Sequence, residues 1–536
     1  MVEVGGGLAA LAAAISAVDN GATVLLVNKG ISGKSGSSAK AAGILAAAFG
    51  HGDFETRPVP DSPKKHALDT LEVGYHIGDP KLVNFVAKQA TSAIHWLESL
   101  GVEFSRAEDG GYIQLNAPGN SCPRAVSAIG GGQAIVSALL HQAKARGVMF
   151  LDETIVRDIK PIEAHKFLVT LQGRQTTSIT TGAAVLAAGG ATGLFPTVSG
   201  DEGNIGTSIM LGYDIGATLK NLEFVEFTLI YRVKSKIIRI AGMAPFLSRG
   251  GKLINSHGED LFGLHFSNKK SEQVGRAEIL RLVEQEIFNN KGPIYLDCTH
   301  FSEVTWQEFE GSQGTTILDK LTEAGCDYRT EKIEVIPAAH SVLAGLEIDT
   351  NAQTTIPGVF AAGENATGIH GAGRLSGNGL TACVVMGLTC GKNASGYTKN
   401  IRHQCKSAMA QKTVSFKQLR GSLNIFTGQS QASIVNDEIG ALIDRVKNIV
   451  GNNLGIIRNE SSLTEGKRQL SKLWLEIKDL DEQNKDVFEL KQMARLANLM
   501  IEAAFKRTES RGVQFRSDFD KPDDSWVKVQ TYNKLY

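Results

Sequence analysis

The first thirty residues constrain the fold of this chain more than any other stretch. They read MVEVGGGLAALAAAISAVDNGATVLLVNKG, which predicts a short strand, a glycine turn, an alanine-rich helix and a second strand over residues 22–27. Gly5, Gly7 and Ala10 match the G-x-G-x-x-A spacing of a βαβ turn, which places a helix N-terminus against a pyrophosphate. The sequence therefore predicts a Rossmann-like α/β domain that binds a dinucleotide.

Two further loops combine glycine with small or polar residues. In SGKSGSSAKAAGILAA, residues 32–47, the small side chains permit close approach to a ligand and the serine hydroxyls can bind a phosphate or a ring edge. In GIHGAGRLSGNGL, residues 368–380, His370 and Arg374 are side chains that can hold an anion. The alternatives are a flexible linker for the first loop and a surface turn for the second.

Size and composition limit the classes of protein that fit. A chain of 536 residues is too long for one ordinary core, so we expect two to four domains. The 56 basic and 56 acidic residues balance, which disfavours a nucleic-acid partner and a membrane surface. No apolar run is long enough for membrane insertion. The segment GLAALAAAISAV lacks a basic leader, so we expect a cytoplasmic location.

The cysteines give no sign of a metal or cluster site. They show neither a CxxC pair nor ferredoxin-type spacing, at positions 122, 298, 326, 383, 390 and 405. The sequence thus predicts a chain from a reducing compartment with no metal of its own.

Later motifs carry a family resemblance. They are AAVLAAGGATGLFPTVSGDEGNIGTSIMLGYDIGATLKNLEFVEF, the block PAAH…GVFAAGE…HGAGRL, and KRTESRGVQFRSDFDKPDDSWVKV near the end. Together with the first glycine turn, they resemble the FAD-dependent flavoproteins of succinate dehydrogenase and fumarate reductase, a family that includes L-aspartate oxidase. The resemblance runs from about residue 4 to about residue 530, and its most specific parts are the PAAH-to-HGAGRL block and ESRG.

The resemblance implies an α/β fold with three parts. The Rossmann-like FAD-binding domain would consist of two segments, residues 1–232 and 333–402. A capping domain, residues 233–332, would be inserted between them, and a C-terminal helical domain with a tail would cover residues 412–536. Helical periodicity in LKQMARLANLMIEAAFKR supports the last of these.

The resemblance also implies FAD as the cofactor. Gly5 to Ala9 would hold the pyrophosphate, Glu364 the ribityl chain, and the glycines at 371, 373, 377 and 379 would let the isoalloxazine ring lie on the backbone. The family's attachment histidine aligns with Gly36, so we expect non-covalent FAD. The cofactor-binding residues carried over are Gly5, Gly6, Gly7, Leu8, Ala9, Lys29, Ser37, Ser38, Gly43, Thr207, Glu364, His370, Gly379 and Leu380.

Catalytic residues follow from the same resemblance. The family moves a hydride between a substrate carbon and flavin N5, and it moves a proton through an arginine of the capping domain. That arginine matches Arg276 in VGRAEIL, whereas His340 in PAAH and Arg374 in HGAGRL match the pair that holds one substrate carboxylate. Here Thr207 stands where the family has an Asp against FAD, so a hydroxyl would replace a carboxylate.

The other end of the substrate site departs from the family. A family histidine aligns with Thr228, a Thr-Glu pair aligns with Met243-Ala244 (or, with one gap, Pro245-Phe246), and RGEGG becomes LSRGG. A second carboxylate would therefore meet Thr228 and an apolar stretch. We expect succinate, fumarate and L-aspartate to be poor substrates, and an acid with an uncharged far end to be preferred.

The sequence leaves two alternative functions and one partner protein open. The chain could be an L-aspartate oxidase, or an FAD-binding protein that has lost turnover. The tail KPDDSWVKVQTY looks like the respiratory branch, which passes electrons to an iron–sulfur subunit, and such a partner would bring the chain to the inner face of a membrane.

Overall fold

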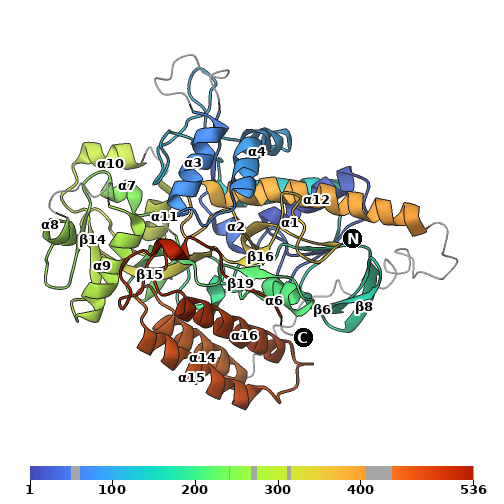
Figure 1. The fold of residues 1–536 in the computed structure, drawn as a ribbon. Coiled ribbons are helices and arrows are strands. Elements are labelled where there is room, and N and C mark those ends of the chain that lie inside the picture. The colour runs from blue at the N-terminus through green and yellow to red at the C-terminus, as the bar shows by residue number, and fades with distance from the viewer. Residues whose placement is uncertain (50–60, 241, 267–273, 311–314, 406–436, 535–536) are drawn as a thin grey trace.

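The computed structural model describes residues 1–49, 61–240, 242–266, 274–310, 315–405 and 437–534. Positions 412–436 of the predicted C-terminal domain lie outside the described residues. In Figure 1, the elements of the capping region and the C-terminal helices lie at two different sides of a body that contains the N-terminal strands.

A parallel sheet forms the base of the FAD-binding region. Its five strands are, in spatial order, β17 (Val359–Ala361), β9 (Ala184–Leu186), β1 (Val2–Val4), β2 (Leu25–Val27) and β5 (Met149–Leu151). Every neighbouring pair is parallel. Strand β17 comes from the second predicted segment and joins β9 of the first, so the expectation of an α/β fold with a divided FAD-binding sheet is confirmed.

Glycine and alanine let two helices pack closely beside this sheet. Helix α1 (Leu8–Asp19) is almost entirely buried, and it lies against the long helix α12 (Asn378–Cys405). A Cβ atom on Gly391 of α12 would lie 2.0 Å from the carbonyl oxygen of Ala13, and one on Gly387 would lie 2.7 Å from that of Ala9. The alanine-rich sequence of α1 is therefore a packing requirement as well as a helix signal.

The predicted N-terminal pattern is confirmed except for the length of its second strand. We expected residues 22–27, and β2 begins only at Leu25. The preceding residues close the C-terminus of α1: the Gly21 amide bonds to the Val18 carbonyl, and the Ala22 amide to the Ala17 carbonyl. These turn bonds use the backbone that a longer strand would need.

Further elements surround the parallel sheet. The helices are α2 (Ser37–Lys40), α3 (Pro63–Val73), α4 (Pro80–Ser99), α5 (Gly131–Ala145), η1 (Thr192–Leu194), α6 (Thr207–Asp214) and η3 (Gly363–Asn365). Two small antiparallel sheets pair β3 (Ile44–Ala46) with β4 (Ala125–Ser127), and β6 (Ile155–Glu163) with β7 (Lys166–Gln172) and β8 (Thr176–Thr181).

The capping region is built on a second five-stranded sheet. Its order is β12 (Lys236–Ile238), β11 (Val225–Val233), β15 (Ile333–Val342), β14 (Ile294–Asp297) and β13 (Lys252–Ile254). Its helices are α7 (Ala244–Leu247), α8 (Leu261–His265), α9 (Arg276–Phe288), α10 (Glu303–Glu310) and α11 (Thr315–Glu323). The proposed boundary at 232/233 falls inside β11 and that at 332/333 at the start of β15, so these paired strands carry the chain in and out of the cap.

In the described part of the C-terminal region, three helices pack on one another: α14 (Asp437–Asn453), α15 (Glu460–Ile477) and α16 (Lys485–Lys506) (Figure 1). The tail that follows contains η4 (Asp524–Trp526) and returns to the FAD-binding region. There β19 (Thr531–Tyr532) completes a sheet with β18 (Ala366–Thr367), β16 (Gly345–Glu347) and β10 (Leu219–Lys220). Among the described residues, no helix has both the length and the apolar character needed to cross a membrane.

A buried ion pair fastens the tail to the body of the protein. Arg507 donates from Nε to Glu223 at 2.7 Å and from Nη1 to Glu509 at 2.8 Å, and all three side chains are fully buried. The motif ESRG, residues 509–512, therefore supplies structural charges here, because Arg511 also pairs with Glu509 at 2.8 Å.

This network predicts a large stability effect. Replacing Glu223 with alanine leaves Arg507 buried with one carboxylate fewer, so we expect the free energy of unfolding to fall by about 3–5 kcal/mol. The control is Glu476→Ala, which breaks an exposed pair with Arg445 between α15 and α14 and should cost much less, because solvent screens that pair. Chemical denaturation of both variants measures the difference, and equal losses would contradict a structural role for the buried pair.

Candidate active site

One cavity of about 2670 Å³ connects the parallel sheet to the capping region. Every catalytic, substrate-binding and cofactor-binding residue carried over from the family lines it, although these residues come from segments far apart along the chain. The glycine turn after β1 opens onto it, and so do Arg276 of the cap and Arg374 of the loop before α12. The geometry thus brings the predicted cofactor and substrate residues to one continuous space.

The first glycine turn is shaped to admit a ligand. Gly5 has a φ of +127°, and a Cβ atom there would lie 2.3 Å from the carbonyl oxygen of Ala187. Gly7 is the N-cap of α1 and offers no capping side chain, so the start of the helix opens toward the cavity along with Leu8 and Ala9. This is the backbone cradle that a pyrophosphate requires.

The second loop supplies hydroxyls beside that cradle. Ser38 Oγ accepts a hydrogen bond from the Leu8 amide at 3.2 Å, and Ser37 Oγ accepts one from the Asp201 amide at 3.1 Å. Gly43 has a φ of +78°, and a Cβ atom there would lie 2.6 Å from the Cα atom of Gly131, so glycine lets the loop pack against the start of α5 while lining the cavity.

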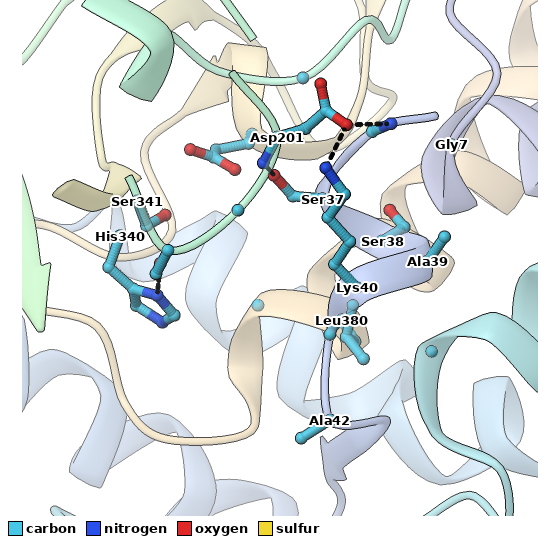
Figure 2. Close-up of a pocket in the computed structure, with 18 of the residues that line it drawn as sticks. Gly7, Ser37, Ser38, Ala39, Lys40, Ala42, Asp201, His340, Ser341 and Leu380 are labelled. Atoms are coloured by element: carbon cyan, nitrogen blue, oxygen red, sulfur yellow. Dashed lines mark hydrogen bonds and ion pairs between the residues drawn. The ribbon is translucent and has the colours of Figure 1, made fainter. Parts of the chain in front are cut away.

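Asp201 is a cavity residue that sequence reasoning missed. Figure 2 shows it above α2, joined to Lys40, with the ion pair measuring 2.8 Å. Its carboxylate also accepts from the Gly36 amide at 3.1 Å. Burial raises the pKa of Asp201, but the bonds from Lys40 and the Gly203 amide outweigh it and lower the pKa. The only sequence signal was an acidic residue between glycines in SGDEGN.

Lys29 and Thr207 occupy the ends of secondary-structure elements. Lys29 follows β2 and lines the cavity, and its Nζ pairs with Glu489 of α16 at 3.0 Å. It therefore links the cavity to the C-terminal helices. Thr207 is the first residue of α6, directly after Gly206 in the left-handed conformation.

Glu364 and His370 are half-buried and line the cavity. Glu364 follows β17, and its Oε1 accepts from the Val342 amide at 2.9 Å. Burial raises the pKa of Glu364 to about 6 and lowers that of His370 to about 3. The Nδ1 atom of His370 has no partner in the described protein, so a buried polar atom is left for a ligand.

The glycines between positions 368 and 380 fall into two groups, one that lines the cavity and one that packs against the end of α3. We expected those at 371, 373, 377 and 379 to lie under the flavin ring, and this is wrong for Gly371 and Gly373, which do not line the cavity. A Cβ on either would lie 2.4 Å from a carbonyl oxygen, of Gly74 and Val73 respectively, so both serve close packing against the end of α3. Gly377 and Gly379 do line the cavity.

Glu226 is the principal residue that sequence reasoning missed. It lies on β11, its side chain is 6% exposed, and it joins two arginines from different parts of the chain. Its Oε1 accepts from Arg276 Nη1 at 2.9 Å, and its Oε2 accepts from Arg374 Nε at 3.0 Å and Nη2 at 2.8 Å. Burial would raise its pKa, but the charges of Arg374 and Arg276 lower it to about 2.

A β-bulge aims His340 at this group. In the pairing of β11 with β15, Glu226 lies opposite Ser341 and Phe227 opposite Ala339, so His340 is the extra residue. Such a bulge redirects a side chain. The Nδ1 atom of His340 lies 2.8 Å from Ser199 Oγ, and Figure 2 shows the His340 ring facing the same pocket as Ser37 and Leu380. Burial, with the charge of Arg374, lowers the pKa of His340 to about 3, so the imidazole is neutral at pH 7.

Uncharged side chains form part of the wall toward the cap. Thr228, Met243 and Pro245 line it, whereas Phe246 is fully buried against the rings of Tyr231 and Phe309. The expectation that Phe246 faces a substrate is therefore wrong.

Two further arginines of the cap line the cavity and were not foreseen. Arg249 donates to the Pro245 carbonyl at 3.1 Å, and Arg239 pairs with Glu202. Both are thus engaged with the protein itself.

Comparison with known proteins settles the family. The family model described as "FAD binding domain" matches residues 2–380, and that described as "Fumarate reductase flavoprotein C-term" matches residues 443–535. The chain belongs to the FAD-dependent succinate dehydrogenase and fumarate reductase flavoprotein family. It is 31% identical to an uncharacterized FAD-dependent oxidoreductase of Methanocaldococcus jannaschii, over 98% of this chain and 94% of the relative.

Other members of the family match along the whole chain. One subunit of the fumarate reductase (CoM/CoB) of Methanothermobacter marburgensis is 28% identical, with 99% of this chain and 96% of the relative covered. An L-aspartate oxidase of Streptomyces coelicolor is also 28% identical, with 98% and 90% covered. A quinol fumarate reductase mutant of E. coli shares the fold, with a TM-score of 0.82 at 23% identity and 100% and 95% covered.

The lowered pKa of Glu226 predicts how the free energy of unfolding changes with pH. Its pKa falls from 4.5 to about 2 on folding, so its carboxylate stabilises the folded state fully above pH 4.5 and progressively less as the pH falls toward 2. We expect the stability advantage of the wild type over Glu226→Gln to shrink by about 2 kcal/mol between pH 5 and pH 3.

Denaturant unfolding at several pH values measures this advantage. The control, Glu334→Gln, breaks an ion pair with Arg232 outside the cavity, and its effect should stay below about 1 kcal/mol throughout. A pH-independent difference for Glu226→Gln would show that the two arginines do not hold its carboxylate.

Proposed function

We propose that the protein is an FAD-dependent oxidoreductase that oxidises or reduces a carbon beside a carboxylate, with FAD bound non-covalently. One observation carries this proposal: Arg276 of the cap and Arg374 of the FAD-binding region both reach a single carboxylate, that of Glu226. Two cations from different parts of the chain therefore meet in the cavity that the cofactor cradle lines, and a substrate carboxylate beside them would be held by the donors that Glu226 leaves free.

The residues present fit FAD. The Gly5 to Ala9 turn would hold the pyrophosphate, and Ser37 and Ser38 would lie beside it. Glu364 and the unpartnered His370 would face the flavin half of the molecule, next to Gly379 and Leu380. When bound, FAD supplies the two-electron chemistry, and the chain supplies binding, orientation and proton transfer.

The groups that face the substrate would have two roles, carboxylate binding and proton transfer. Arg374 and His340 would hold one carboxylate, with Arg374 as a fixed planar cation and His340 as a neutral hydrogen-bonding group. Because Ser199 engages Nδ1 of His340, contact with the substrate falls to Nε2. Arg276, at the first turn of α9 and 39% exposed, would carry the proton between the substrate and solvent.

An electron-transfer partner belongs to this proposal. The described residues contain no cluster of His, Cys, Asp and Glu suited to a metal ion. We therefore propose that electrons pass to or from the flavin through a second substrate or through an iron–sulfur subunit.

The proton-transfer role of Arg276 is tested by a conservative change. Arg276→Lys should lower the rate of flavin reduction or reoxidation by about 10²- to 10⁴-fold, because the group that moves the proton is displaced while the cofactor cradle is intact. Stopped-flow absorbance with a panel of mono- and dicarboxylic acids measures the rate. The control is Arg281→Lys on the same helix, where the side chain lies over Phe515 outside the cavity. Similar rates in both variants would remove Arg276 from the mechanism.

The mode of FAD attachment gives a second test. Gly36 has no side-chain atom for a covalent bond, so acid or heat should release intact FAD from the purified protein. Absorbance of the supernatant after precipitation measures the release, and the variant Gly36→His examines whether that position lies close enough to attach. Flavin that stays with the precipitated wild-type protein would contradict non-covalent binding.

A further inference from the structure

Glu226 occupies the donors that a substrate carboxylate would use. Its two oxygens take three N–H groups, two from Arg374 and one from Arg276, at 2.8–3.0 Å. The bonds place the Glu226 carboxylate where an anionic ligand would complete the same arginine pair. Glu226 is a permanent part of the protein, and its carboxylate therefore uses hydrogen-bond donors that an anionic ligand would otherwise use.

This carboxylate also changes the charge available to a ligand. Near Glu226 the cations are Arg276 and Arg374, while the imidazoles of His340 and His370 are neutral at pH 7 because their pKa values lie near 3. Glu226 cancels one of the two positive charges. Glu364, whose pKa is about 6, adds negative charge from the cofactor side, so little positive charge is left for a ligand.

The two arginines of the cap that line the neighbouring wall, Arg239 and Arg249, are already engaged with other groups of the protein. The lining side chains Thr228 and Met243 offer a hydroxyl and an apolar surface. Arg239 pairs with Glu202, and Arg249 donates to the Pro245 carbonyl and lies 5.3 Å from the centre of the Phe309 ring. The lysines that line the cavity from the cap, at positions 236 and 320, are exposed at its solvent side.

We infer that Glu226 determines the substrate class: the site takes an acid with one carboxylate and an uncharged far end, and Glu226 excludes dicarboxylates. A monocarboxylate needs only the donors left over, namely Arg374 Nη1, the rest of the Arg276 guanidinium and His340. A dicarboxylate would bring its second charge to a wall whose arginines are already engaged, at a site whose positive charge is already partly cancelled. The inference rests on the proposed function and names its substrate.

Butyrate and succinate form a matched pair of probes, because both are four-carbon acids and differ only at the far end. Titration of the FAD-loaded protein with each anion, followed by the flavin difference spectrum, gives dissociation constants without turnover. We expect the wild type to bind butyrate at least about tenfold more tightly than succinate.

The variant Glu226→Gln should shift this preference. Removing one negative charge favours every anionic group of a ligand, so succinate gains more than butyrate, and the ratio of their dissociation constants should move by about tenfold toward succinate. Glu334→Gln makes the same change on β15 at a residue paired with Arg232 outside the cavity, and it should leave the ratio unchanged.

The possible results separate the inference from the proposed function. Equal binding of the two anions by the wild type, or an unchanged ratio in a folded Glu226→Gln, would overturn the inference and leave the proposed function standing. If neither anion perturbs the flavin of the wild type, the proposed function fails and the inference fails with it. The comparison in the wild type needs no variant, so the test remains decisive if Glu226→Gln does not fold.

Discussion

The ion pairs of Glu226 hold the candidate active site together. Arg276 begins a helix of the cap and Arg374 lies in the loop before α12, and one buried carboxylate on β11 bonds to both. The burial of Glu226 makes these attractions stronger than in water, and Arg374, which is largely buried, would be costly to leave unpaired. Glu226 therefore links the start of α9 in the cap to the loop before α12 in the FAD-binding region.

Glycine determines how closely the backbone elements around the cavity approach. Along α12, Gly387 and Gly391 admit α1, while Gly371 and Gly373 admit the end of α3. The same residue type serves the cradle at Gly5, where a side chain would collide with the β9 strand end. The missing side chain of glycine thus permits both close packing of helices and close approach to a ligand. A glycine motif alone does not show which of the two it serves.

Local sequence motifs predicted much of this molecule, but they did not predict contacts between residues far apart in the sequence. The βαβ fingerprint and the family motifs predicted the α/β fold and a set of catalytic and cofactor-binding residues that line one cavity, because each motif positions its own side chains. Glu226 and Asp201 escaped notice because their partners, Arg374 and Lys40, are more than a hundred residues away. The bulge at His340 escaped for the same reason, since it exists only in the pairing of two distant strands.

The most direct test of this account is a crystal structure of the protein with FAD and butyrate. The account predicts that the pyrophosphate lies against Gly5 to Ala9, that the flavin lies beside Glu364 and Leu380, and that the butyrate carboxylate bonds to Arg374 and His340 while Glu226 keeps its bonds to both arginines. Flavin outside this cavity, or butyrate bound away from Arg374, would contradict it.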